Sequence, residues 1–244
     1  MSSPSVFLTI IFPAHNEEGR IAATLRKTIA FLEKQPYPSE ILVVENGSRD
    51  ATLEIAGSFA KDYQALRVLH EDARGKGLAV KRGMLEAKGE FRFICDVDLS
   101  MPIEEVNRFL PPLLKSEITI ASREAAGSTR YNEPEYRHII GRVFNFIVRV
   151  FALPGLHDTQ CGFKCFSARA AEELFPYQTI NGWTFDVEIL FVARKLGYSI
   201  KELGIPWYHD PNSKVKVFRD SLQMFLDLLR IRLKDLRGIY AKKI

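Results

Sequence analysis

The first half of the chain alternates between short apolar runs and segments whose apolar residues recur with helical spacing, and this alternation constrains the fold most strongly. The segment between the first two runs, for example, carries Ile21, Leu25, Ile29 and Leu32 on one helical face. Alternating strands and helices predict a parallel sheet with right-handed crossovers, and runs that are apolar throughout predict strands covered on both faces. We therefore predict an α/β fold in which helices flank a mostly parallel sheet. The expected strands lie at residues 6–12, 41–44, 68–69, 91–95 and 118–121.

Polar residues collect immediately after these expected strands. Asn16-Glu17, Glu45-Asn46 and Ser122-Arg123 each follow an apolar run, as does Asp96-Val97-Asp98. The carboxyl ends of parallel strands meet at one edge of a sheet, where open α/β sheets bind their ligands. We therefore expect the functional site at this edge.

Two acidic residues, Asp96 and Asp98, follow the fourth apolar run and point to a metal–diphosphate site. Their side chains share one face if the strand continues, and carboxylate oxygens are ligands that Mg²⁺ and Mn²⁺ prefer. The alternative is that the pair caps a helix beginning near Pro102, since acids and proline are common at helix starts.

Charge is unevenly distributed along the chain. The net charge is +4, yet residues 212–244 alone carry nine Lys or Arg against three Asp. Residues 217–236 place Leu222, Leu226, Leu229 and Leu233 on one helical face, which favours a basic amphipathic helix at an anionic membrane surface. Packing of this apolar face against the domain is the alternative.

Composition excludes several classes of protein. No run approaches the roughly 20 apolar residues of a membrane span. Three Cys without a CxxC pattern argue against a disulfide framework or a zinc site and favour reduced thiols in the cytoplasm. No GxGxxG motif follows the first apolar run, which argues against a dinucleotide-dependent dehydrogenase.

An ordered set of motifs resembles the family 2 glycosyltransferases of the GT-A (Rossmann-like) fold. The motifs are FPAHNEE at residues 12–18, ENGSRD at 45–50, RGKG at 74–77 and DVD at 96–98. DTQCGFK at residues 158–164 and SKV at 213–215 narrow the resemblance to the dolichyl-phosphate β-glucosyltransferase branch, close to the dolichyl-phosphate mannose synthases. Glu45 and Asn46 depart from the two Asp usual in the second motif, and no segment resembles the transmembrane anchor that the membrane branch often carries.

The resemblance implies a site for the nucleotide-sugar donor. Asp98 is expected to bind the Mg²⁺ or Mn²⁺ ion, and Asp96 to face the donor sugar or ribose. The RGKG loop is expected to bring Lys76 near the donor diphosphate, with a solvated turn as the alternative. The other residues expected at the donor are Pro13, His15, Glu17, Glu45, Asn46 and Val97.

The resemblance also implies a site for a lipid phosphate acceptor. A phosphomonoester is largely dianionic at neutral pH, so the site needs cations more than a base. Asp158 is the first choice if a general base is used, and a surface charge is the alternative role for Arg137. The residues expected at the acceptor phosphate are Arg123, Arg137, Gln160, Ser213 and Lys214.

Together these features predict inverting, metal-dependent transfer of glucose from UDP-glucose to a dolichyl or polyprenyl phosphate. GDP-mannose or UDP-GlcNAc as donor, and a non-catalytic nucleotide-sugar-binding protein, are the alternatives. We expect a catalytic domain at residues 1–211, with a donor half at 1–122 and an acceptor half at 123–211, followed by the membrane-interface helix at 212–244. The expected location is the cytoplasmic face of a membrane, as a peripheral protein with no nucleic-acid partner.

Overall fold

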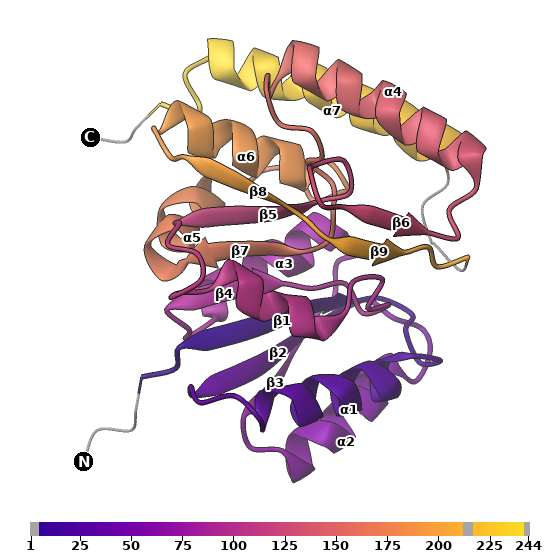
Figure 1. The fold of residues 1–244 in the computed structure, drawn as a ribbon, viewed down its shortest axis with the longest axis vertical. Coiled ribbons are helices and arrows are strands. Elements are labelled where there is room, and N and C mark those ends of the chain that lie inside the picture. Colours follow the sequence, from indigo (N-terminus) through magenta and orange to yellow (C-terminus); the bar gives the residue numbers. More distant parts are fainter. Residues whose placement is uncertain (1–4, 212–216, 242–244) are drawn as a thin grey trace.

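A seven-stranded mixed sheet forms the centre of the protein (Figure 1). The computed structural model describes residues 5–211 and 217–241. The strand order is β3-β2-β1-β4-β7-β5-β8, and all neighbours are parallel except β7, which runs antiparallel to β4 and β5. The strands are β1 (Leu8–Ala14), β2 (Ser39–Asn46), β3 (Leu66–Glu71), β4 (Phe91–Ile94), β5 (Ile118–Ser122), β7 (Lys164–Ser167) and β8 (Ile200–Gly204).

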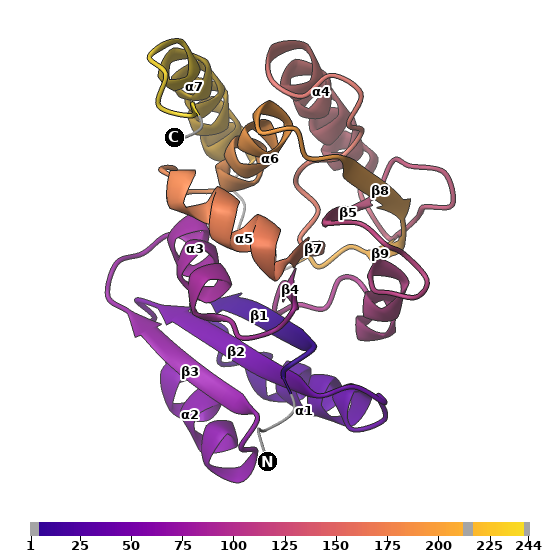
Figure 2. The same cartoon turned by 90° about the vertical axis from the view of Figure 1, so that its left-hand side faces the viewer.

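Helices cover both faces of the sheet, which makes three layers (Figure 2). On one face lie α1 (Ile21–Leu32), α2 (Thr52–Asp62) and the 3₁₀ segment η1 (Ile103–Phe109). The other face carries α3 (Lys76–Glu86), α5 (Ala168–Leu174), the 3₁₀ turn η2 (Phe175–Tyr177) and α6 (Phe185–Lys195).

Side-chain alternation in β1 explains the two cores. Leu8, Ile10 and Phe12 are buried in the cluster beneath α1, whereas Ile11 is buried in the opposite cluster with α3. A strand with both faces covered needs apolar side chains on both faces, which is why its sequence shows no alternation of polar and apolar residues.

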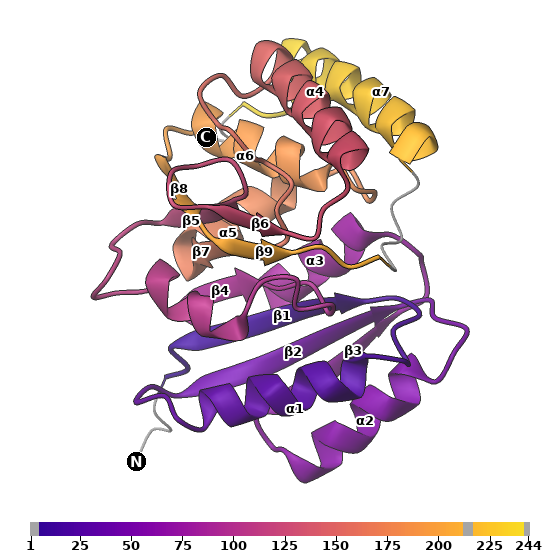
Figure 3. The same ribbon diagram turned by 45° about the vertical axis from the view of Figure 1, so that its right-hand side comes forward.

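Of the remaining elements, α4 and α7 lie at the top of the molecule in Figure 1, and β6 and β9 lie at mid-height on the right. A second, two-stranded parallel sheet joins β6 (Thr129–Tyr131) to β9 (Pro206–Tyr208). Helices α4 (Glu135–Phe151) and α7 (Val217–Leu236) lie side by side, with Phe151 and Phe225 in edge contact (Figure 3). No helix within residues 5–211 and 217–241 has the length and apolar content needed to cross a bilayer.

The predicted fold class is confirmed, including the C-terminal amphipathic helix. The strands predicted in the first half all occur, and their ends shift by at most a few residues. Strands β6, β7, β8 and β9 were not predicted from the sequence, because polar and charged residues leave no apolar run in β6, β7 or β8 and a proline opens the three-residue β9. The seven-stranded sheet contains strands from both sides of residue 122, so the proposed donor half (1–122) and acceptor half (123–211) share one sheet.

Candidate active site

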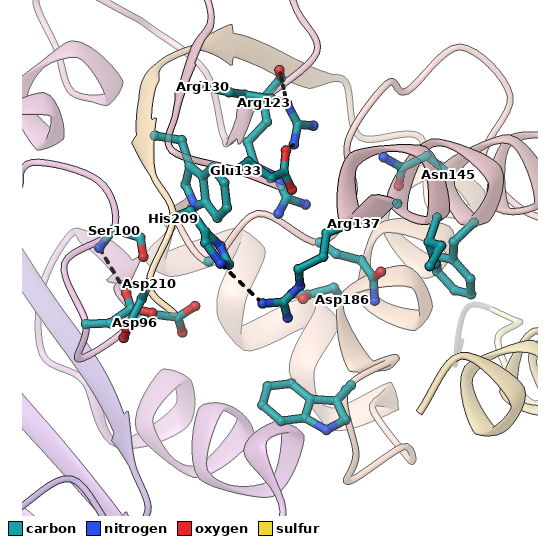
Figure 4. Close-up of a pocket in the computed structure, with 18 of the residues that line it drawn as sticks. Asp96, Ser100, Arg123, Arg130, Glu133, Arg137, Asn145, Asp186, His209 and Asp210 are labelled. Atoms are coloured by element: carbon teal, nitrogen blue, oxygen red, sulfur yellow. Dashed lines mark hydrogen bonds and ion pairs between the residues drawn. The ribbon is translucent and has the colours of Figure 1, made fainter. Parts of the chain in front are cut away.

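A pocket of about 250 Å³ lies beyond the carboxyl end of β4, and residues of α4 and α7 line part of it (Figure 4). Its wall combines Asp96 and Asp98 after β4, Lys76 at the start of α3 and Arg137 of α4. The predicted position of the site at the strand ends therefore matches a real cavity. Other residues that line it and matter below are Arg123, Arg130, Glu133, Gly141, Gln160, Gly162, Trp183, Asp186, Trp207, His209, Asp210 and Met224.

The acid pair stands at the floor of this pocket. One oxygen of Asp98 accepts a hydrogen bond of 2.9 Å from the backbone N–H of Ser100, so Asp98 also stabilises the turn before η1. Burial raises the pKa of Asp98, and the neighbouring charge of Asp96 raises it further. A cation near Asp98 would relieve this repulsion, and the pair is therefore a suitable place for a metal ion.

Lys76 faces the same acids. Its Nζ lies 2.6 Å from Oδ1 of Asp96 and 5.4 Å from the centre of the Trp183 ring. Burial alone would lower the pKa of Lys76, but the charges of Asp96 and Asp186 outweigh burial and raise it. Lys76 is thus a charged group inside the pocket, within reach of a diphosphate bound over the acid pair.

The RGKG loop that carries Lys76 is packed, so the alternative of a solvated turn is wrong. The backbone N–H of Gly77 donates to the carbonyl of Asn181 at 2.9 Å, and the Gln178 amide donates to the carbonyl of Gly77 at 2.7 Å. A Cβ on Gly75 or Gly77 would lie 2.5 or 2.6 Å from a backbone oxygen of residues 180–181. Glycine at positions 75 and 77 therefore allows the RGKG loop to pack closely against the backbone of residues 180–181.

Gly162 has a similar role next to the acid pair. A Cβ at this position would lie 2.0 Å from Oδ2 of Asp96, closer than any side chain tolerates. The sequence pattern included Gly162 only as part of a family motif and gave no sign of this contact.

The residues predicted at the nucleotide, other than Val97, lie at or just after the ends of β1 and β2 and do not line the pocket. The ring of His15 is hydrogen-bonded through Nδ1 to the carbonyl of Asn46 at 2.8 Å. Glu17 donates its N–H to Thr52 at 2.7 Å and pairs with Arg20, which also pairs with Asp210. Pro13 is the second-to-last residue of β1, whereas Val97 follows β4 and is buried in the core.

Glu45 is buried and already holds two partners. Its carboxylate accepts hydrogen bonds from the backbone of Ser48 and from Nδ1 of His70, the latter at 2.6 Å. Burial would raise the pKa of Glu45, but these hydrogen bonds outweigh it and lower the pKa. Sequence reasoning missed His70, since it lies 25 residues away at the end of the next strand.

We expect His70 to make stability depend on pH. Hydrogen bonds to Glu45 and Asp72 raise the pKa of His70 above its ordinary 6.5. A raised pKa in the folded state stabilises the fold fully below pH 6.5, and this contribution disappears as the pH rises through the folded-state pKa. Thermal melts of wild type and His70→Gln should therefore differ most near pH 6 and converge toward pH 9. A difference that stays constant with pH would contradict this.

At the other wall of the pocket, Arg123 and Asp158 form a buried bidentate pair. The guanidinium donates to the two carboxylate oxygens at 2.6 and 2.9 Å, and the backbone N–H of Arg123 donates at 3.0 Å. Burial would raise the pKa of Asp158, but the charge of Arg123 outweighs it and lowers the pKa to about 2. A carboxylate so stabilised accepts protons poorly, so the geometry favours a positioning role for Asp158 over a general base.

The other predicted acceptor residues differ in their surroundings. Arg137 lines the pocket and lies 3.4 Å from Nε2 of His209, so it faces the site and is not a mere surface charge (Figure 4). Gln160 lines the pocket and donates its backbone N–H to Asp158 at 3.2 Å. Ser213 and Lys214 lie outside the described residues.

Both tryptophans of the chain line the pocket, which the sequence did not indicate. Trp183 packs against the core, and its ring lies under Lys76. Trp207 has the guanidinium of Arg123 at 5.4 Å and that of Arg130 at 5.9 Å from its ring centre. A cation over an indole ring is attracted by the ring's electrons. These contacts depend on the tertiary structure, so the sequence alone does not reveal them.

A buried ion pair completes the wall beneath the acid pair. Nζ of Lys164 lies 3.0 Å from Oδ1 of Asp186, which sits in the first turn of α6. Burial raises the pKa of Asp186 despite the charges of Lys164 and Lys76. Asp186 thus joins Asp96 as a carboxylate near Lys76.

Comparison with known proteins agrees with this geometry. Residues 9–175 match the family described as Glycosyl transferase family 2. The dolichyl-phosphate beta-glucosyltransferase of Drosophila melanogaster is 35% identical over 254 residues, which cover 98% of this chain and 78% of that protein. Its namesake in Saccharomyces cerevisiae is 33% identical over 257 residues, covering 96% of this chain and 77% of that protein.

Solved structures show the same fold. Glucosyl-3-phosphoglycerate synthase from Mycobacterium tuberculosis in complex with UDP aligns with a TM-score of 0.69 and 19% identity, covering 93% of this chain and 80% of that chain. The same enzyme with Mn²⁺, UDP-glucose and phosphoglyceric acid aligns with a TM-score of 0.67 and 17% identity, over 93% and 79% of the two chains. Since the family match and the relatives together span nearly the whole sequence, the chain belongs to glycosyl transferase family 2.

Proposed function

We propose that this protein is an inverting glycosyltransferase that moves glucose from UDP-glucose to a dolichyl or other polyprenyl phosphate. The names of its relatives support the glucose and the dolichyl phosphate. The observation that carries the proposal is one pocket with acids at its floor, cations on its wall and an apolar end between α4 and α7. Those three features suit a nucleotide diphosphate with its metal, a phosphate acceptor and a lipid chain, respectively.

The reaction is a single displacement at the anomeric carbon. A phosphate monoester has its second pKa near 6 and is mostly dianionic at neutral pH, so its oxygen is a nucleophile without a base. That oxygen forms a bond to the anomeric carbon on the face opposite UDP, while the bond from that carbon to the diphosphate oxygen breaks and its electrons leave with UDP. Lys76 is placed to stabilise the departing diphosphate, and Asp96 orients Lys76 before the donor binds.

A divalent metal ion fits the acid pair. Asp98 supplies a partly buried hard oxygen ligand, and Mg²⁺ is commonly bound by one or two carboxylates together with substrate phosphates. No three His, Cys, Asp or Glu side chains gather around one point among residues 5–211 and 221–241, and the donor's diphosphate together with water would supply the remaining ligands. Bound there, Mg²⁺ or Mn²⁺ would neutralise the charge that builds up on the leaving UDP.

The outer surface of α4 and α7 suits a membrane. Ile139, Val143 and Phe146 of α4 and Leu226 and Leu233 of α7 are exposed, on two helices that lie side by side (Figure 3). The leucine-rich face predicted from the sequence points outward, whereas Met224, Leu228 and Ile231 pack inward. An exposed apolar surface of this kind, on helices rich in Lys and Arg, favours peripheral attachment to the cytoplasmic face of an anionic membrane.

A donor assay tests the proposed reaction. Purified protein would receive radiolabelled UDP-glucose, GDP-mannose or UDP-GlcNAc in parallel, each with polyprenyl phosphate and Mg²⁺, followed by organic extraction. We expect label in the organic phase from UDP-glucose. Label from another donor alone would change the sugar but keep the chemistry, and nucleotide-sugar binding without any extracted label would favour a non-catalytic binding protein.

Gly141 of α4 offers a second test, because it lines the pocket and a Cβ there would meet nothing within 4 Å. Gly141→Ala should stabilise the protein by about 0.5–1 kcal/mol, since glycine is unfavourable inside a helix. Gly141→Trp should instead fill the apolar end and lower transfer to a long polyprenyl phosphate by more than about tenfold, through lost lipid contacts. Melting curves and transfer rates would check both. Normal turnover of the long acceptor by Gly141→Trp would contradict the proposed lipid path.

A further inference from the structure

Four cations line the pocket within the described residues, and three of them are paired with carboxylates. Lys76 pairs with Asp96 at 2.6 Å, and Arg123 is bidentate to Asp158. Arg130 pairs with two glutamates, Glu124 and Glu133. An incoming phosphate would have to compete with a carboxylate for each of these three cations, and the buried pair of Arg123 would be the most costly to break.

The fourth cation, Arg137, faces an imidazole instead. Its Nη1 lies 3.4 Å from Nε2 of His209, a long contact, and no carboxylate of residues 5–211 or 221–241, whose side chains the structure describes, lies within ion-pair distance of its guanidinium. Since a guanidinium can only donate, Nε2 can accept from it only in the tautomer that carries the ring hydrogen on Nδ1. The guanidinium of Arg137 can therefore bind an anion without first leaving a carboxylate partner.

His209 is held in place from its own side of the pocket. Its backbone N–H donates to the carbonyl of Tyr131 at 3.0 Å, which fixes the chain just after β9. Its ring lies 5.8 Å from that of Trp207, and Trp207 in turn supports the guanidinium of Arg123. Figure 4 shows the imidazole between Asp210 and Asp96 on one side and Arg137 on the other. The imidazole ring thus lies between Asp96, which is expected to face the donor, and Arg137, which is expected to face the acceptor phosphate.

We infer that His209 is a ligand of the acceptor's phosphate and acts together with Arg137. The Arg137–His209 contact opens when the phosphate enters, and the guanidinium then donates to one phosphate oxygen. The imidazole turns its N–H, on either nitrogen, toward another oxygen, because a neutral ring can carry its hydrogen on Nδ1 or Nε2. This pair gives the phosphate two donors without displacing a carboxylate, and Arg123 with Asp158 becomes the rigid support behind Trp207.

The inference rests on the proposed transfer reaction, so its test starts from wild-type turnover. Kinetics would use UDP-glucose, Mn²⁺ and farnesyl phosphate in detergent, for wild type, His209→Ala, His209→Gln and Arg137→Ala. His157→Ala serves as the control, because His157 is exposed and does not line the pocket. Titration calorimetry of UDP with Mn²⁺ would be run on every variant.

We expect His209→Ala to raise the acceptor KM by about tenfold or more, since charge-assisted contacts to phosphate are the strong kind. His209→Gln should recover part of this loss because an amide donates a hydrogen bond, and UDP–Mn²⁺ affinity should stay within about twofold of wild type. The double variant Arg137→Ala/His209→Ala should lose less than the product of the single losses, as expected for two groups that bind one anion.

Three outcomes would overturn the inference. An unchanged acceptor KM in His209→Ala would show that the imidazole does not touch the phosphate. Loss of UDP–Mn²⁺ affinity would place His209 at the metal or the donor. A loss in Arg137→Ala/His209→Ala equal to the product of the two single losses would show that Arg137 and His209 act independently and do not bind one phosphate together. Absence of any wild-type transfer would be a failure of the proposed reaction and would be recognised as such before any variant is compared.

Discussion

Asp98→Asn should lower glucosyl transfer by more than about 100-fold while the protein melts as wild type does. The substitution keeps the shape and the hydrogen bond from Ser100 but removes the charge that would hold the metal. Because burial and Asp96 raise the pKa of Asp98, the fold gains nothing from the ionised form, and neutralising it should not destabilise the protein. Initial rates and calorimetric melting of the same preparations would measure both effects.

Glu104→Gln is the matched control, since it removes an exposed carboxylate six residues further along the chain. It should change neither the rate nor the melting temperature. Full activity of wild type in excess EDTA, or an Asp98→Asn rate near that of the control, would contradict the role proposed for Asp98.

Phe146→Ser combined with Leu233→Ser should abolish most of the binding to anionic vesicles. These side chains are 63% and 53% exposed, so their loss takes little buried area from the fold, whereas full insertion of each would contribute on the order of 2 kcal/mol at a membrane. Salt should weaken wild-type binding only in part, because screening affects the Lys and Arg contribution but leaves apolar insertion. Vesicle flotation at low and high salt would measure this.

Leu113→Ser provides the control, because Leu113 is 71% exposed but follows η1, away from α4 and α7. The control should float as wild type does. Transfer to farnesyl phosphate in detergent should be normal in all three proteins, which separates membrane docking from chemistry. Equal flotation of wild type and the double variant, or no flotation of wild type, would refute membrane docking through this surface.

The sequence predicted the first half of the fold well because most strands there contain an apolar run that is buried, and β1, β2 and β3 are each followed by a helix. The second half was harder to predict. Strand β7 contains Lys164, whose charge is satisfied by Asp186 in a helix that begins 18 residues after the strand ends, and local patterns carry no sign of such a pair. The antiparallel direction of β7 likewise depends on its neighbours β4 and β5, not on its own residues.

The candidate site was predictable to a similar extent. The motif order located Asp96, Asp98 and Lys76, and the structure brings all three into one pocket. It did not indicate that Arg123 and Asp158 are bound to each other, because ion pairs between distant segments depend on tertiary contacts. His209 and Trp207 carried no signal at all, since a single tryptophan within a three-residue strand, or a histidine just after it, has no periodic or motif context.

The anomeric configuration of the product tests the central claim most directly, because it reports the donor sugar, the phosphate acceptor and the single displacement together. Purified protein would convert UDP-glucose and polyprenyl phosphate with Mg²⁺, and ¹H and ³¹P NMR would identify the extracted lipid. We predict a β-linked glucosyl monophosphate, formed with inversion from the α-linked donor. An α-linked product, a lipid diphosphate sugar or free glucose as the sole product would contradict the proposed reaction.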